Sequence, residues 1–263
     1  MEVLAVRPAG SGTLPGGVMR LTYRSPADGV EDWTLLWPPE AGRTWLVCLH
    51  GHGSHGDQLY VRTDLERGWL PEFRRRGVGI LTPNLRDNAW MSPPAAADLH
   101  SLLQYLRSRQ GAEQFVIVSG SMGGTGALIY AVLHPEDLAG VGAMCPATDV
   151  GSYHDWCSRQ PGPPVLSEVA AAIRSAYGGP PEEKREVYEQ HSCLAHADRL
   201  TMPVFVAHGD ADELIPVGES RALSAIVRAG NLKYHEMPGG GHDSPLAPAV
   251  LREALDWILP GSH

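Results

Sequence analysis

Ser121 is the first candidate for covalent chemistry in this sequence of 263 residues. It lies in the stretch FVIVSGSMGGTG (residues 115–126), which runs from a β-branched segment through small residues into an apolar segment. The frame S-G-S-M-G is close to the pattern G-x-S-x-G, with Ser119 in place of the first glycine. A serine on such a strand-to-helix turn is held in a strained backbone, so its close neighbours must be small. A phosphate-binding loop is the alternative, but it would prefer a lysine near the helix start, and this segment has none.

A carboxylate and a histidine that could activate this serine follow later in the chain. Residues 203–216 (PVFVAHGDADELIP) contain Asp210, Asp212 and Glu213, and a later glycine-rich turn, MPGGGHDSP, contains His242. A hydroxyl is a weak nucleophile, so it needs a base, and the base needs a carboxylate that orients it. Serine, acid and histidine occur in this order, each after an apolar strand-like run, which indicates nucleophilic catalysis. The local pattern leaves all three acids open as the orienting carboxylate.

The stretch LHGHGSHGD (residues 49–57) raises a competing possibility, because three histidines and an aspartate could bind a metal ion. The metal-binding run H-x-H-x-D-H has an aspartate immediately before its last histidine, and Ser54 stands at that place here. His100 and His134 fall within or just after helical patterns, and zinc needs several converging ligands with supporting contacts. We therefore predict no metal and no other cofactor, and we interpret the stretch as a sharp glycine-rich turn.

The elements that would position these residues alternate after an antiparallel start. Residues 18–26 and 31–38 alternate in polarity around Asp28 and Gly29, which predicts a hairpin. Short apolar runs, typical of strands buried on both faces, follow at 45–50, 78–85, 115–119, 139–145, 203–208 and 232–237. Helix-period segments separate them at 95–110, 122–134, 217–229 and 246–259. The pattern predicts an α/β fold with a doubly wound, mostly parallel sheet that begins with an antiparallel hairpin.

One segment, residues 147–202, is too long for a simple connection between two strands. It carries two amphipathic patterns, at 167–177 and 181–191, and a tryptophan, Trp156. We predict that it forms a small helical cap inserted over the carboxyl ends of the strands, where open α/β sheets bind ligands.

Together these motifs resemble the α/β-hydrolase superfamily, in the branch of small bacterial esterases, dienelactone-hydrolase-like proteins and prolyl-oligopeptidase-type catalytic domains. The resemblance covers nearly the whole chain from residue 18 on. In that branch the acid follows the pattern H-G-x-x-D-x-x-[VI]-P, which is matched by His208, Gly209, Asp212, Ile215 and Pro216. The resemblance therefore selects Asp212 as the acid. A serine rather than a cysteine at position 121 argues against a true dienelactone hydrolase, and Ser119 leaves the subfamily open.

The resemblance implies a serine carboxylic-ester hydrolase that acts through an acyl-enzyme, with Ser121, Asp212 and His242 as its triad. The expected substrates are small-molecule esters with short-chain, aryl or carbohydrate-linked acyl groups. Two other functions are open: a serine peptidase of the prolyl-oligopeptidase type, and a non-catalytic binding protein of the same fold. A peptidase of that type usually carries a propeller domain, and a binding protein would ordinarily have lost a triad residue.

The resemblance also implies where the negative charge of the reaction is stabilised. The pair His50-Gly51 matches the start of the family's oxyanion loop, so the backbone N–H groups of His52 and Met122 are the expected donors. We expect large loop and cap side chains to line the substrate pocket: Trp90, Met91 and Trp156.

Composition restricts the partners and the location of the protein. The formal net charge of −9 argues against binding to nucleic acid or to an anionic membrane surface. We find no signal peptide or membrane-spanning run, and the four cysteines lack C-x-x-C spacing, so a cytoplasmic protein is expected, with Cys48 and Cys145 as buried thiols. Residues 1–260 are predicted to form one domain, and residues 261–263 are interpreted as a tag remnant.

Overall fold

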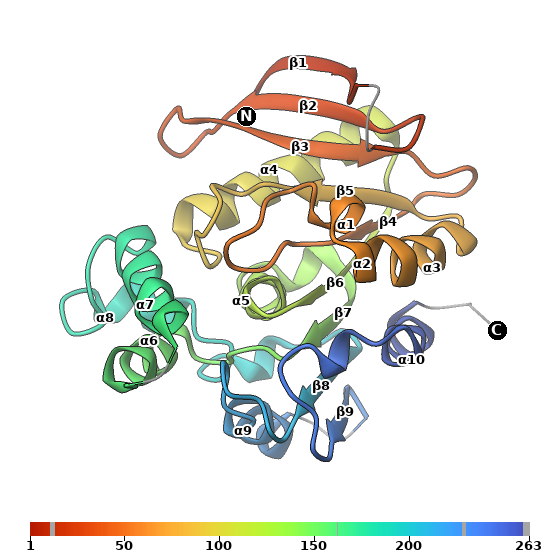
Figure 1. The fold of residues 1–263 in the computed structure, drawn as a ribbon. Coiled ribbons are helices and arrows are strands. Elements are labelled where there is room, and N and C mark those ends of the chain that lie inside the picture. Colours follow the sequence, from red (N-terminus) through yellow and green to blue (C-terminus); the bar gives the residue numbers. More distant parts are fainter. Residues whose placement is uncertain (11–13, 162, 228–229, 260–263) are drawn as a thin grey trace.

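In the described part of the chain, a nine-stranded sheet lies between layers of helices (Figure 1). The computed structural model describes residues 1–10, 14–161, 163–227 and 230–259, so the predicted tag remnant lies outside the described residues. Across the sheet the strands follow the order β1-β2-β3-β5-β4-β6-β7-β8-β9. In chain order they are β1 (Glu2–Pro8), β2 (Met19–Arg24), β3 (Glu31–Trp37), β4 (Thr44–Val47), β5 (Gly79–Pro83), β6 (Gln114–Gly120), β7 (Leu138–Met144), β8 (Val204–Gly209) and β9 (Leu232–Met237).

The sheet begins antiparallel and continues parallel, as the sequence predicts. β2 pairs with β1 and β3, and β3 pairs with β5, all in antiparallel register. The remaining pairs, from β5–β4 to β8–β9, are parallel. The doubly wound α/β fold and its antiparallel hairpin are therefore confirmed. The edge strand β1 is not predicted, because nearly all its residues are exposed and no alternation marks a buried face.

The helices cover both faces of the sheet, and each layer has its own apolar core. One layer contains α4 (Pro93–Gln110), α5 (Met122–Leu133) and α9 (Gly218–Ile226). The other contains α1 (Gln58–Val61), α2 (Thr63–Gly68), α3 (Leu70–Arg75) and α10 (Pro248–Ile258). The short helices α1 to α3 are not predicted by the sequence pattern. Of the helix predicted at 217–229, the last two residues lie outside the described residues.

The predicted stripe of α4 is the clearest agreement between pattern and packing. Its leucines at positions 99, 102, 103 and 106 are all fully buried. The helix ends at Gly111, which adopts a left-handed φ of 65° and whose N–H donates to the Leu106 carbonyl oxygen. A residue without a side chain suits that position, so the stop signal in the sequence has a direct structural cause.

Residues 147–202 leave the sheet and form a separate group of helices beside its carboxyl edge (Figure 1). The group contains α6 (Val150–Arg159), α7 (Pro164–Ala176) and α8 (Arg185–Gln190), and the 3-10 helix η2 (Ala197–Arg199), near the end of the segment, contacts α5 instead. The helices expected at 167–177 and 181–191 correspond to α7 and α8. The sequence pattern misses α6, which the Asp149 side chain caps by accepting a hydrogen bond from the Ser152 N–H at 2.8 Å.

Two other sequence expectations concern apolar segments. All four cysteines are buried and free, which confirms the prediction for Cys48 and Cys145. Among the described residues, no helix combines the length and apolarity that crossing a membrane requires. Two further 3-10 helices, η1 (Pro135–Asp137) and η3 (Ser244–Leu246), complete the secondary structure.

Candidate active site

Ser121 lies on the turn between β6 and α5, in a backbone conformation that few residues adopt. Its φ of 57° and ψ of −127° are outside the common regions, and its N–H donates to the Met144 carbonyl oxygen at 2.9 Å. The turn packs closely against the chain after β4, because a side-chain carbon at Gly123 would lie 2.5 Å from the Leu49 carbonyl oxygen. Only glycine fits there, which explains the small residues around the serine.

Ser119, the departure from the family pattern, has a structural role in the same turn. Its hydroxyl oxygen accepts a hydrogen bond from the Leu49 N–H at 2.8 Å, and its side chain is fully buried. The contact joins the end of β6 to the segment that continues from β4 into the glycine-rich stretch. Ser119 therefore helps to fix the distance between the two segments that flank Ser121.

His242 and Asp212 lie in line with Ser121. The Ser121 hydroxyl oxygen is 2.9 Å from His242 Nε2, and His242 Nδ1 is 2.7 Å from the Asp212 carboxylate. The other Asp212 oxygen accepts the N–H groups of Leu214 and Ile215 at 2.8 and 3.0 Å. The structure thus brings together the three side chains that the sequence suggests, from three separate strand ends.

The competing acid, Asp210, faces away from this group. Its carboxylate accepts the Gly239 N–H at 2.6 Å in an exposed turn, and Glu213 is exposed as well. By contrast, the Asp212 side chain is fully buried, and the His242 side chain is 16% exposed. Geometry and burial both favour Asp212 as the partner of His242.

The pKa values of this pair are shifted in opposite directions. Burial would raise the pKa of Asp212, but hydrogen bonds from His208 and His242 outweigh it and hold the pKa well below its usual range. Burial would lower the pKa of His242, but the hydrogen bond and charge of Asp212, together with the Cys145 sulfur, raise it above its usual value. The carboxylate therefore stays ionised and stabilises the protonated imidazole.

Two residues beside the pair are ones that sequence reasoning did not place in the site. Cys145 Sγ lies 4.0 Å from His242 Nε2, at the end of β7, where the backbone has a positive φ of 43°. His208 Nε2 lies 3.2 Å from Asp212, and its Nδ1 is 2.7 Å from the Ser220 hydroxyl. Both residues stand at the carboxyl ends of buried strands, and that position was the signal available in the sequence.

The two expected oxyanion donors flank Ser121. Met122 is the first residue of α5, so its N–H has no partner within the helix. His52 lies in the loop after β4 and lines the same cavity as Ser121. Burial lowers the pKa of the His52 imidazole, and its Nδ1 accepts a hydrogen bond from Trp90 Nε1 at 3.3 Å. The His52 ring is thus engaged by Trp90, and the backbone N–H of His52 is the group expected to face the substrate.

A cavity of about 160 Å³ opens above Ser121. Its apolar wall comes from the α2–α3 region, α7 and η3, through Leu65, Trp69, Val165, Leu166, Val169 and Leu246. Gln58, Arg62 and Asp243 add polar groups to the lining. The segment predicted to be a cap therefore supplies part of the wall beside the serine.

Of the three side chains expected to line the pocket, the structure places one there. Trp90 lines the cavity, and its carbonyl oxygen accepts a hydrogen bond from the Tyr177 hydroxyl at 2.9 Å. Met91 and Trp156 are not among the described residues that line it. Met91 points into a small inner space behind the site, and Trp156 stacks on Tyr153, which itself lines the cavity. Spacing alone did not show which loop side chains face the serine.

The side-chain clusters whose geometry could suit a metal ion do not include the histidines of the stretch LHGHGSHGD, as far as the structure describes the chain. Among the described residues, the candidate sets are His100, His134 and Asp137, and Cys145, Asp212 and His242. Neither includes His50, His52 or His55. The second set is the His242–Asp212 pair with Cys145 beside it, and in the first set the Asp137 carboxylate already pairs with the Arg107 guanidinium.

Comparison with known proteins gives the same class as the fold. A family model described as the alpha/beta hydrolase fold matches residues 44–164. A monoacylglycerol lipase from Mycolicibacterium smegmatis is 24% identical over 267 residues, covering 85% of this chain and 91% of that protein.

Solved structures superimpose over most of the chain. The Staphylococcus aureus serine hydrolase FphF has a TM-score of 0.67 at 16% identity and covers 93% of this chain and 99% of its own. A puromycin-hydrolyzing peptidase from Mycobacterium tuberculosis has a TM-score of 0.68 at 19% identity, covering 90% of this chain but 39% of that one. The chain thus has the fold of α/β hydrolases and is similar in sequence to an ester-hydrolysing enzyme.

Proposed function

We propose that the protein is a serine carboxylic-ester hydrolase in which Ser121, His242 and Asp212 form the catalytic triad. The observation that carries this proposal is the unbroken line of contacts from the Ser121 hydroxyl through His242 to Asp212, at the base of a cavity. A nucleophile, a base and an orienting carboxylate within hydrogen-bond distance are the arrangement that covalent acyl transfer requires.

The proton follows this line in each half of the reaction. His242 Nε2 takes the Ser121 proton as the hydroxyl oxygen attacks the ester carbonyl, and then gives it to the departing alcohol. In the second half, His242 takes a proton from water, which attacks the acyl-enzyme and releases the acid. Asp212 keeps the proton on Nδ1 and stabilises the imidazolium that forms twice in each cycle.

The carbonyl oxygen gains negative charge in both halves. The N–H of Met122 and the N–H of His52 are the proposed donors to that oxygen. In a related arrangement, loss of a single such donor costs about 3–4 kcal/mol of transition-state stabilisation.

The charges around the cavity favour a neutral substrate. Arg62 is a cation in the lining, and Asp64 holds its guanidinium at 2.8 and 2.9 Å while Asp243 contacts it at 3.1 Å. This cation is therefore already neutralised. An ester with no charge near its carbonyl fits such a lining better than a carboxylate or a free amine does.

The size of the cavity favours a short acyl group. Ligand pockets commonly measure roughly 300–1,000 Å³, whereas this cavity is about 160 Å³. Short-chain or aryl acyl groups are the proposed acyl part. The alcohol part is proposed to be a carbohydrate or another small alcohol, and the monoacylglycerol lipase relative adds glycerol as a candidate.

Hydrolysis of p-nitrophenyl esters of increasing chain length tests the proposal. We expect turnover of acetate and butyrate esters, with kcat/KM falling for chains longer than the cavity accepts. Ser121→Ala is expected to lose at least about 10⁴-fold in kcat, because no other group supplies the covalent step.

Two other outcomes would contradict the proposal. Cleavage of aminoacyl p-nitroanilides as efficiently as esters would favour the peptidase alternative, whose solved relative is much longer than this chain. Correctly folded protein that turns over no acyl substrate would favour a binding protein. The intact triad geometry argues against this last function.

A further inference from the structure

The loop that carries His52 is held by side chains from a second loop. Residues 84–90, which follow β5, contact residues 50, 52, 53, 55 and 56 through five separate polar contacts. The contacted residues lie on both sides of His52. The second loop therefore holds the first loop in place along its whole length, rather than at one end.

Asn84 holds the two ends of the first loop. Its carbonyl oxygen lies 2.7 Å from His50 Nε2, and because a carbonyl oxygen only accepts, the imidazole donates this hydrogen bond. Its side-chain oxygen accepts the Gly56 N–H at 3.2 Å. Space is tight at that point, since a side-chain carbon at Gly56 would lie 2.8 Å from the Asn84 nitrogen.

Asn88 and Trp90 hold the centre. The Asn88 side-chain oxygen accepts the Gly53 N–H at 2.7 Å, and Trp90 donates to the His52 ring. On the other side, the Gly51 N–H donates to the Gln58 side chain at 2.8 Å. The peptide unit after His52 is thus fixed, and so is the one that precedes Gly51. The peptide between them carries the His52 N–H, and its Gly51 carbonyl oxygen lies 2.9 Å from His50 Nδ1, so the direction of that N–H is fixed as well.

The second loop, together with the next residue, Met91, has an unusual backbone. Leu85, Arg86, Asp87, Trp90 and Met91 all have positive φ, between 46° and 62°. A non-glycine residue in this region is strained, so such a loop persists only where its surroundings enforce it.

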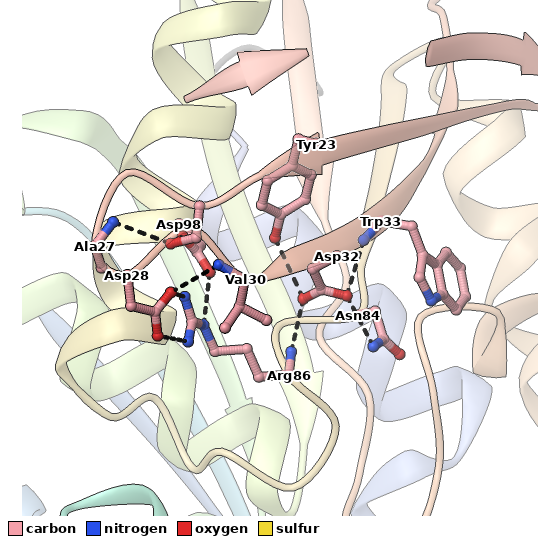
Figure 2. A network of polar contacts seen from close by, with 10 residues as sticks. Tyr23, Ala27, Asp28, Val30, Asp32, Trp33, Asn84, Arg86 and Asp98 are labelled. Carbon is pink, nitrogen blue, oxygen red and sulfur yellow. Dashed lines mark hydrogen bonds and ion pairs between the residues drawn. The ribbon is translucent and has the colours of Figure 1, made fainter. Parts of the chain in front are cut away.

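A polar network that reaches from the buried Asp32 and Asp98 to the exposed Asp28 enforces this conformation (Figure 2). The Arg86 guanidinium bridges Asp28 in the β2–β3 turn and Asp98 in α4, at 2.6 and 2.7 Å. Asp32 accepts the Asn84 side chain at 3.0 Å and the Arg86 N–H at 2.8 Å. The network ties the second loop to the antiparallel hairpin and to α4, at a distance from the reacting groups.

We propose that Asn88 is a positioning residue for oxyanion stabilisation: it fixes the peptide after His52 so that the His52 N–H points at the substrate oxygen. This inference rests on the proposed function of Ser121 and His52. The charge on that oxygen develops only in the transition state, so a loosened donor lowers kcat and leaves KM almost unchanged.

The test is steady-state hydrolysis of p-nitrophenyl acetate by Asn88→Ala, Asn88→Asp and the wild-type protein. Asn88→Ala removes the acceptor of the Gly53 N–H and is expected to lower kcat about 10- to 100-fold, with KM within about twofold. Affinity for phenylboronic acid, which forms a tetrahedral adduct on serine, should fall in parallel. Asn88→Asp retains an acceptor oxygen and should recover most of the lost kcat.

A matched control is Asn231→Ala, since that asparagine also makes one side-chain hydrogen bond to the backbone, to Leu200 at 3.2 Å, far from the site. It should leave kcat unchanged. Unchanged kcat in Asn88→Ala, or a fall that Asn88→Asp does not reverse and that a lower melting temperature accompanies, overturns the proposal. If the proposed function itself fails, the wild-type protein hydrolyses no ester, and the positioning role falls with it.

Discussion

Two histidine–aspartate pairs in this molecule have nearly the same geometry and different surroundings. In the proposed active site, His242 Nδ1 lies 2.7 Å from the Asp212 carboxylate. Near η1, His100 Nδ1 lies 2.8 Å from the Asp137 carboxylate. Both carboxylates are buried, with 0% and 2% of their side chains exposed.

The difference lies in the groups on either side of each pair. Asp137 also contacts the Arg107 guanidinium and accepts the Tyr130 hydroxyl at 2.6 Å, so its charge is shared among several donors. Beyond His100 stands the stacked ring of His134, with ring centres 4.5 Å apart. Beyond His242 stands the Ser121 hydroxyl. The two histidine–aspartate contacts therefore differ in what lies next to the imidazole, which is a second ring at His100 and a hydroxyl at His242.

Replacing each aspartate should separate catalysis from stability, and the largest effect is expected at Asp212. Asp212→Asn should lower kcat about 10³- to 10⁴-fold, because the imidazole loses both its correct tautomer and its charge partner. Asp210→Asn, in the exposed turn nearby, should leave kcat within about twofold. Steady-state ester hydrolysis measures both. Equal losses in the two variants would contradict the assignment of the acid.

Asp137→Asn should act on stability instead. It leaves the Arg107 guanidinium without its buried partner, and we expect the free energy of unfolding to fall by about 2–3 kcal/mol, with kcat within about twofold. Denaturant titration gives the first quantity and ester hydrolysis the second. A loss of kcat comparable to that of Asp212→Asn would show that the two pairs do not differ in role.

The pH dependence of activity should reflect the raised pKa of His242. Only the neutral imidazole is a base, so a raised pKa means that kcat/KM rises with pH and reaches half its maximum above the ordinary histidine value of about 6.5. A kcat/KM profile against pH for the ester substrate measures this. In the weakly active Asp212→Asn variant the midpoint should move to lower pH. A wild-type midpoint below about 6 would contradict the stabilising effect of Asp212.

The pH dependence of stability should reflect the lowered pKa of Asp137. Burial raises this pKa, but hydrogen bonds from Tyr130, Arg107 and His100 lower it further than burial raises it. Stability from this group is therefore complete above the unfolded value of about 3.9 and is lost as the pH falls through the folded value. Between pH 6 and pH 3, the melting temperature should fall less steeply in Asp137→Asn than in the wild-type protein. If the slope of melting temperature against pH is unchanged in the variant, Asp137 does not contribute to acid unfolding.

Chelation should produce the smallest effect. If His100, His134 and Asp137 form a structural cluster rather than a metal site, EDTA should change neither the ester hydrolysis rate nor the melting temperature. Inhibition or destabilisation that added zinc reverses would contradict this expectation, and it would also revive a metal role for the histidine-rich stretch.

Much of the fold could be predicted because its signals are local. The parallel strands, the stripe of α4 and its stop at Gly111 depend on neighbours within one or two turns of chain. Strand β1 and helix α6 were missed for local reasons as well. The first is exposed on nearly every side, and the second begins at a cap, Asp149, that the pattern did not single out.

The candidate site, like the fold, could be predicted only in part. Ser121, Asp212 and His242 each follow a strand, so a resemblance and strand-end topology suffice to suggest them. Cys145 beside His242 was interpreted only as a buried thiol, since a contact across 97 positions leaves no periodic trace. Met91 and Trp156 are predicted at the pocket but do not line it. The spacing of residues in a loop does not show which way a side chain points.

The left-handed backbone of residues 85–87 also bears on the order of folding. Such a conformation cannot persist in an isolated loop, because it depends on Asp28 and Asp32 from the hairpin and on Asp98 from α4. During refolding, the parallel strands can pair before that hairpin docks, but the loop holding His52 cannot take its final shape. Activity is therefore expected to return last, after the secondary structure seen by circular dichroism has recovered.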